Sequence, residues 1–224
     1  ELAFQQVGIP VCPIYPTTNP KELSFILNDA TIKYIFNSGE DILEKVVSIK
    51  NEVPSLKGIY SYDNIAGVTF WDEIIKNITP EDLQKVEAVK ATIKAEHCAT
   101  IIYTSGTTGK PKGVMLSHRN LVSNVLNSVT SFPFEKNVEG RSLSFLPLNH
   151  IFERMVSYIY IYNGISIYYA QSLETIGEDM KEVKPNLFTT VPRLLEKVYE
   201  KIMIKGSELT GVKRKLFDWA VALG

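Results

Sequence analysis

The hydrophobic positions of this 224-residue chain change repeatedly between two spacings. Short runs rich in β-branched and aromatic residues are typical of strands. The predicted strands cover residues 11–17, 32–38, 58–62, 98–105, 141–148, 164–170 and 186–191. Between them, apolar residues recur every three or four positions, which predicts amphipathic helices. The predicted helices cover residues 19–30, 40–54, 69–77, 79–93, 117–129, 150–163 and 192–223. This alternation predicts an α/β fold, part of a multilayer αβα domain with a largely parallel sheet.

Three residues mark where helices are expected to begin or break. Asn19 precedes Pro20, a pairing of N-cap and first helical residue that favours a helix start. Thr79 precedes a proline and two acids, which is a second start signal because acids are favourable in the first turn. Gly206 interrupts the last helical stretch, so we expect a break there.

The ends of the chain predict a domain that is truncated at both ends. Residues 1–10 have the pattern of the end of an amphipathic helix, and the chain does not begin with Met. The sequence contains no internal repeat, low-complexity tract or linker-like segment. We therefore treat residues 1–224 as one partial domain without an internal boundary.

Composition excludes several classes of function. The net charge is −1 and the pI is about 6.4, which does not support binding to nucleic acid or a polybasic membrane contact. Two distant cysteines and three histidines without metal-site spacing argue against a zinc centre. The most apolar run, residues 155–170, is broken by Asn163 and Gly164, so we expect a helix, a turn and a strand rather than a membrane span. These features predict a cytoplasmic protein, with peripheral membrane contact left open.

The stretch YTSGTTGKPKGVMLSH, residues 103–118, carries the strongest chemical signal. A Walker A loop ending at Lys110 would need glycine at position 104 and Ser or Thr at 111. The chain has Thr104 and Pro111 instead. The dinucleotide fingerprint G-x-G-x-x-G also fails, because the glycines are three and four residues apart.

A hydroxyl-lined loop after a buried strand remains. Two glycines allow positive φ and close approach of a ligand, and successive N–H groups can then bind an anion. The hydroxyls supply hydrogen bonds for phosphate oxygens, and two lysines supply positive charge. The candidate phosphate-binding residues are Thr104, Ser105, Gly106, Thr107, Thr108, Gly109, Lys110 and Lys112. The alternative is a surface turn rich in Gly and Thr, but the length of the run favours a phosphate site.

This stretch resembles the signature loop of the adenylate-forming enzymes, which include acyl-CoA synthetases, peptide-synthetase adenylation domains and luciferases. The resemblance implies that residues 104–110 hold the β- and γ-phosphates of ATP. It places Thr104 nearest to Mg²⁺ and makes Lys110 a catalytic residue. It also implies activation of a carboxylate as an acyl-adenylate, followed in most members by transfer to a thiol.

Three further stretches resemble the acyl-CoA synthetases. They are residues 8–30, LPLNHIFERM at residues 146–155, and residues 191–202. The last two are similar to the long-chain fatty-acid branch, which implies fatty acid, ATP and coenzyme A as substrates. By the same resemblance His150 lies beside the carboxylate and adenylate as a catalytic residue. The alternative is a histidine at a helix start that packs under the sheet. Glu153 and Arg154 are either a substrate-side pair or a structural pair or cap, and we favour the structural role.

Some expected family motifs are not found in this sequence. They are the Y-G-x-T-E motif with its magnesium-holding glutamate, the ribose-binding aspartate motif and the C-terminal catalytic lysine. We therefore expect residues 1–224 alone not to complete adenylation. Two alternatives stay open: an enzyme that adenylates aryl or amino acids for a carrier protein, and a non-catalytic binding protein that keeps the fold.

Overall fold

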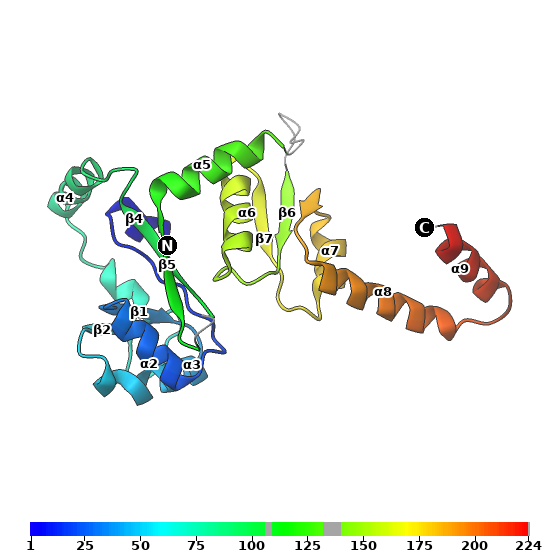
Figure 1. Ribbon diagram of the computed structural model, residues 1–224, viewed down its shortest axis with the longest axis horizontal. Helices are drawn as coiled ribbons and strands as arrows, with labels where there is room; N and C mark the ends of the chain where they lie inside the picture. The colour runs from blue at the N-terminus through cyan, green and yellow to red at the C-terminus, as the bar shows by residue number, and fades with distance from the viewer. Residues whose placement is uncertain (106–108, 132–139, 224) are drawn as a thin grey trace. The chain divides into compact units, whose positions relative to one another are not determined.

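A computed structural model describes residues 1–105, 109–131 and 140–223. The chain forms two compact units, which are described separately. Unit 1 comprises Glu1–Lys136 and Pro147–Tyr162, and unit 2 comprises Asn137–Leu146 and Asn163–Gly224. Figure 1 labels most of the helices and strands of both units.

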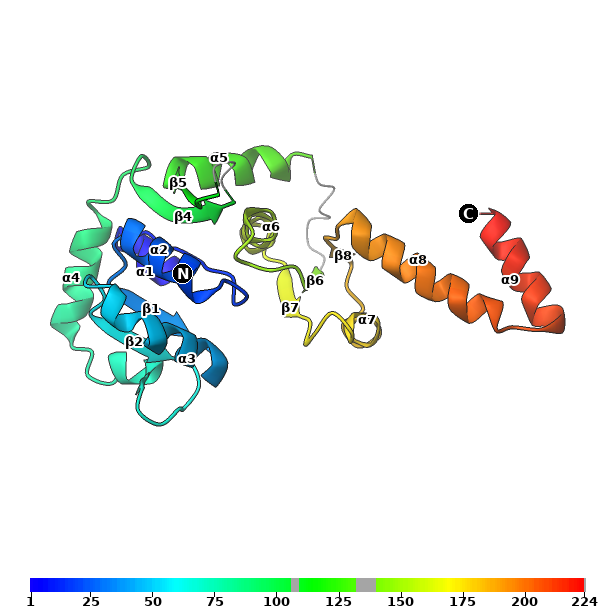
Figure 2. The same cartoon turned by 60° about the horizontal axis from the view of Figure 1, so that its bottom comes forward.

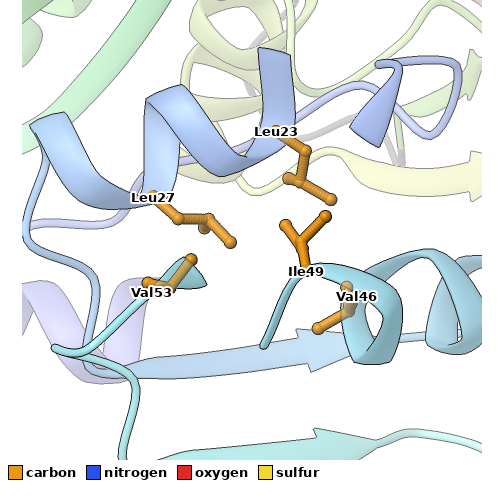
Figure 3. Packing of buried hydrophobic residues seen from close by; sticks show 5 residues of the cluster. All are labelled: Leu23, Leu27, Val46, Ile49 and Val53. Atoms are coloured by element: carbon orange, nitrogen blue, oxygen red, sulfur yellow. The ribbon is translucent and has the colours of Figure 1, made fainter. Parts of the chain in front are cut away.

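Unit 1 begins with a short helix, α1 (Leu2–Gln6), and a small parallel sheet. The sheet has the order β1 (Tyr34–Asn37), β2 (Gly58–Ser61) and β3 (Thr69–Phe70). Helices α2 (Pro20–Asp29) and α3 (Glu40–Ile49) pack beside it, and a 3₁₀ turn, Lys50–Glu52, follows α3. Their shared core consists of Leu23, Leu27, Val46, Ile49 and Val53, as Figure 3 shows. Burial of these side chains holds α2 and α3 rigidly together, because close-packed apolar contacts resist displacement.

The predicted strand at residues 98–105 is confirmed as β4 (Cys98–Thr104), and it pairs with a strand that the sequence pattern did not predict. This second strand, β5 (Lys112–Ser117), runs antiparallel to β4. On the other edge of β4, the Val11 N–H donates to the Ala99 carbonyl at 3.1 Å, and the Ile101 N–H donates to the Val11 carbonyl at 3.0 Å. The prediction of a full strand at residues 11–17 is wrong, because this segment forms only the bridge at Val11.

Two helices cover the hairpin region of unit 1. They are α5 (His118–Val129) and α6 (Ile151–Tyr162). A second core joins them to β4 through Ala99, Leu121, Val125, Met155 and Ile159. A further helix, α4 (Pro80–Lys90), is amphipathic only weakly and buries none of its residues.

Unit 2 contains a parallel sheet with the order β7 (Ser166–Tyr169), β6 (Arg141–Ser144) and β8 (Leu187–Phe188). The helix α7 (Ile176–Val183), which the sequence pattern did not predict, precedes β8. Two further helices, α8 (Pro192–Ser207) and α9 (Gly211–Leu223), follow as separate segments joined by a short turn (Figure 2). The predicted break at Gly206 is misplaced, because this glycine lies within α8 and the helix ends after Ser207.

The α/β prediction is confirmed, since both three-stranded sheets are parallel and helices alternate with the strands. Asn19 caps α2 by accepting a hydrogen bond from the Glu22 N–H, and Thr79 forms a capping box with Asp82 at the start of α4. Residues 69–77 are not the predicted helix; they form β3 and a 3₁₀ turn, Trp71–Ile74. The apolar run at residues 155–170 forms most of α6, a turn and β7, as expected. No helix in the described ranges is long and apolar enough to cross a bilayer.

Candidate functional site

The β4–β5 hairpin presents the predicted phosphate loop. The last residue pair of the hairpin is Thr104 with Lys112, so the loop leaves and re-enters a hydrogen-bonded ladder at these two positions. Thr104, Ser105, Gly109, Lys110 and Lys112 are described by the structure. The other predicted loop residues, Gly106, Thr107 and Thr108, lie outside the described residues.

Gly109 has the backbone conformation that the sequence predicts. Its φ is +81°, a backbone conformation that residues other than glycine rarely adopt. A Cβ added at Gly109 would meet no atom of the described residues within 4 Å, so the positive φ is the observed reason for a glycine here. A backbone in this conformation can turn its N–H groups toward an anion.

The loop side chains with polar groups are exposed. Thr104, Ser105, Lys110 and Lys112 all face solvent. No described residue forms an ion pair with either lysine, so both charges are open to an anion from solution. Anions bind such sites through charge-assisted hydrogen bonds, which are stronger than neutral ones.

The donor type at Thr104 suits Mg²⁺. This ion prefers oxygen ligands and usually shares its coordination shell with substrate phosphates and water. Thr104 offers an exposed hydroxyl oxygen beside the loop. Within the described parts of the chain, no group of three or more His, Cys, Asp or Glu residues gathers to hold a metal. The role of Thr104 at a metal therefore stays a prediction.

His150 immediately precedes α6 and acts as its cap. Its Nδ1 accepts a hydrogen bond from the Phe152 N–H at 3.2 Å, and its carbonyl accepts one from the Arg154 N–H at 3.3 Å. A neutral imidazole that accepts at Nδ1 carries its proton on Nε2. Because the side chain is exposed, Nε2–H is a donor that faces outward. The geometry allows both the structural reading, a helix cap, and the catalytic one, a donor to a substrate oxygen.

Arg154 has a structural environment, as the sequence interpretation favours. It is 2% exposed, and its Nε donates to the Leu148 carbonyl at 3.1 Å. Its Nη1 donates to Thr100 Oγ1 at 2.9 Å and lies 3.4 Å from a Glu1 carboxylate oxygen. Glu153 is also buried, at 1% exposure, and has an interaction partner of its own. Neither side chain is placed to meet a substrate from solvent.

The other histidine near the loop does not cap its helix. His118 is the first residue of α5, and Ser117 is the N-cap, forming a capping box with Asn120. The Nε2 atom of His118 is buried and lacks a hydrogen-bond partner among the described residues. His118 therefore lies partly buried at the start of α5, and Ser117 caps the helix.

The sequence analysis missed one contact at the base of the loop. Tyr103 Oη donates a hydrogen bond to Asp29 Oδ2 at 2.6 Å, although the residues are 74 positions apart. No local pattern signals such a pair, because Asp29 ends a helix of ordinary amphipathic spacing. A cavity of about 1000 Å³ lies elsewhere in unit 1, and none of the predicted site residues lines it.

Known proteins are similar in sequence to most of this chain. A family model described as AMP-binding enzyme matches residues 1–220. The long-chain-fatty-acid–CoA ligase ACSBG2 of Homo sapiens is 32% identical over 220 residues, which are 94% of this chain and 33% of that protein. The peroxisomal long chain acyl-CoA synthetase 6 of Arabidopsis thaliana is 31% identical over 222 residues, 93% of this chain and 30% of that protein. The chain thus spans about a third of the length of these curated relatives.

Solved structures with lower sequence identity share the fold. The adenylation domain of a carboxylate reductase from Mycobacterium chelonae matches with a TM-score of 0.71 at 20% identity, over 94% of this chain and 36% of that chain. ATP-bound MatB from Rhodopseudomonas palustris matches with a TM-score of 0.65 at 22% identity, over 88% of this chain and 37% of that chain. With the family model covering residues 1–220, these matches show that the chain belongs to the AMP-binding enzyme family, the adenylate-forming ligases, and has long-chain acyl-CoA synthetases among its relatives.

Proposed function

We propose that the protein carrying this chain is a long-chain fatty-acid–CoA ligase. It activates a fatty acid with ATP to an acyl-adenylate and pyrophosphate, and then forms acyl-CoA. The observation that supports this most directly is the exposed loop of hydroxyls and lysines on the β4–β5 hairpin. The loop occurs in a chain whose relatives at 31% and 32% identity are named as long-chain acyl-CoA synthetases.

The loop residues would bind the triphosphate of ATP. The backbone N–H at Gly109 can donate to a phosphate oxygen, because this residue is in the left-handed region and no described residue crowds it. Thr104 and Ser105 add hydroxyl donors, and Lys110 and Lys112 add charge. When bound, Mg²⁺ would help to neutralise the charge that builds as pyrophosphate departs. Thr104 is the residue of the described loop that would approach it.

His150 would act on the carboxylate. Its Nε2–H is a donor because Nδ1 is held as an acceptor by the Phe152 N–H. A donor of this kind can orient a carboxylate and stabilise its charge during attack on the α-phosphate. The cap would keep the imidazole ring in one orientation, which reduces the entropy cost of placing the donor.

Activation in two steps has a chemical reason. A carboxylate is a poor acyl donor, because its oxide is a poor leaving group. Attack of a carboxylate oxygen on the α-phosphate forms a new O–P bond and breaks the bond to the β-phosphate, which releases pyrophosphate. The former oxide is then part of AMP, a good leaving group. The thiolate of coenzyme A then displaces AMP and leaves a thioester.

The test is product formation by the complete protein that contains this chain. Incubation with ATP, Mg²⁺, coenzyme A and palmitate or oleate should give acyl-CoA, AMP and pyrophosphate, identified by mass spectrometry. Thioester formation from aryl or amino acids but not from fatty acids would overturn the substrate assignment. Our expectations that residues 1–224 alone do not complete adenylation, and that the protein is cytoplasmic with possible peripheral membrane contact, stay predictions.

A further inference from the structure

The hydrogen bond between Tyr103 and Asp29 lies at the base of the phosphate loop. Tyr103 is the residue before Thr104, the last residue of β4. Its Oη donates to Asp29 Oδ2 at 2.6 Å, a short bond of the kind made to an ionised carboxylate. The contact therefore joins the strand that begins the loop to the end of α2.

Asp29 is held on a rigid support. It is the last residue of α2, where the helix dipole disfavours a negative charge. A hydrogen bond from Tyr103 offsets this local cost. The same helix contributes Leu23 and Leu27 to the apolar core shared with α3 (Figure 3). The carboxylate is thus anchored to a packed core rather than to a loop.

Gly113 extends the contact to the second strand. It is paired with Tyr103 in the β4–β5 register, next to the terminal pair of Thr104 with Lys112. A Cβ added at Gly113 would lie 3.0 Å from Tyr103 Cζ and 3.2 Å from Tyr103 Oη. The tyrosine ring therefore lies against β5 where a side chain is missing. Both strands that bear the loop are in contact with the one ring that reaches Asp29.

The Tyr103 hydroxyl keeps its proton and so remains a hydrogen-bond donor. Burial, and then the Asp29 carboxylate, raise the pKa of Tyr103 well above its usual range. It stays protonated at any pH at which an enzyme of this family would be assayed. The Tyr103 hydroxyl is therefore available as a donor throughout this range of pH.

We propose that Tyr103 is a positioning residue whose hydrogen bond to Asp29 fixes the end of the β4–β5 hairpin, and with it Thr104 and Lys112 at the two ends of the predicted ATP phosphate loop. This inference rests on the proposed function, because it assigns a role in binding ATP. Tyr103 does not touch the phosphates in this account. It fixes the positions of Thr104 and Lys112, the residues at which the loop begins and ends.

The central variant is Tyr103→Phe in the complete protein, which removes the hydroxyl and keeps the ring against Gly113. We expect the KM for ATP to rise roughly tenfold, with the KM values for fatty acid and coenzyme A unchanged. Backbone amides of β5 should exchange hydrogen faster, because the end of the hairpin opens more often. Tyr34→Phe is the matched control, since Tyr34 is an exposed tyrosine of β1, and it should leave both readouts unchanged.

A double-mutant cycle separates the pair from its surroundings. Asp29→Ala should raise the KM for ATP like Tyr103→Phe, and the double variant should be no worse than either single variant. Asp29→Asn keeps an acceptor oxygen and should restore most of the affinity for ATP. If the double variant showed the sum of the two single effects on the KM for ATP, Tyr103 and Asp29 would act independently, and a shared role would be contradicted.

Three outcomes decide the proposal. A raised KM for ATP with faster exchange in β5 supports it. A lowered thermal midpoint with unchanged KM for ATP overturns it, because the contact would then serve stability alone. If the wild-type protein activates no acid, the proposed function fails and the role of Tyr103 in ATP binding fails with it. The exchange experiment then tests only whether the hydrogen bond fixes the hairpin: unchanged protection of β5 in Tyr103→Phe would show that it does not.

Discussion

Arg154 Nη1 donates a hydrogen bond to Thr100 Oγ1 over 2.9 Å inside unit 1. Thr100 lies in β4, four residues before Thr104 at the edge of the phosphate loop. The same guanidinium donates from Nε to the Leu148 carbonyl, two residues before His150. A single buried side chain thus links the strand that carries the loop to the segment that carries the histidine.

Loss of this link should destabilise unit 1. Arg154→Leu leaves the Leu148 carbonyl and the Glu1 carboxylate without their cationic partner, and breaking such buried contacts costs about 3 kcal/mol. Denaturant unfolding should show the loss as a lower transition midpoint. Arg119→Leu is the control, because Arg119 is exposed and pairs on the surface with Glu96. A loss no larger than that of the control would contradict the linking role of Arg154.

Lys110→Ala should weaken ATP binding. The side chain is exposed in the loop and no described residue pairs with its charge, so its removal should leave the fold intact. Loss of one charge-assisted contact to a phosphate, worth about 1.4 kcal/mol in a wet site, corresponds to a roughly tenfold rise in the KM for ATP. Steady-state kinetics at varied ATP measure this. Lys90→Ala, a surface lysine paired with Glu87 on α4, should behave as wild type. An equal KM for ATP in Lys110→Ala and Lys90→Ala would contradict a role for Lys110 in ATP binding.

Two substitutions at His150 separate its structural and chemical roles. Asparagine is a good helix cap and can accept the Phe152 N–H in place of Nδ1, but it lacks the outward Nε2–H donor. If the histidine acts on the carboxylate, His150→Asn should keep wild-type stability and lower kcat about a hundredfold. His150→Ala should lower both kcat and stability, the latter by about 1 kcal/mol. Full activity of His150→Asn would leave the residue as a cap alone.

Cys12 should react slowly with alkylating reagents. Burial raises the pKa of this thiol to about 11, although the nearby Arg154 guanidinium opposes the rise. The thiolate is the reactive form, so alkylation at pH 8 should be roughly a hundredfold slower than for a free thiol. Because the folded pKa lies above the unfolded one, Cys12 contributes stability below about pH 9 that is lost as pH rises toward 11. Iodoacetamide labelling followed by mass spectrometry across pH 7–11 checks the profile; a midpoint near pH 9 in the folded protein would contradict it.

Local features of the fold could be predicted from the sequence. The caps at Asn19 and Thr79 depend on side chains three residues apart or fewer, so their signal is contained in short windows. The parallel sheets follow from strands that alternate with helices. The positive φ of Gly109 follows from a glycine in a turn between polar residues.

Features that depend on distant contacts could not be predicted. β5 begins with a lysine and a glycine, which is a weak strand pattern. It forms because β4 supplies its hydrogen-bond partners. Gly206 has the pattern of a helix break, yet it lies inside α8. Glycine is needed there for packing, because a Cβ would be 2.0 Å from the Phe217 ring of α9. The bond from Tyr103 to Asp29 spans 74 residues and depends on how α2 meets β4.

The measurement that tests the central claim most directly is ATP–pyrophosphate exchange by the complete protein. The panel runs from acetate to long saturated and unsaturated fatty acids, with aryl and amino acids beside them. The loop on the β4–β5 hairpin and the long-chain relatives predict exchange that depends on ATP and is fastest with long-chain acids. Exchange with aryl or amino acids alone would contradict the substrate, and no exchange with any acid would contradict the enzymatic function itself.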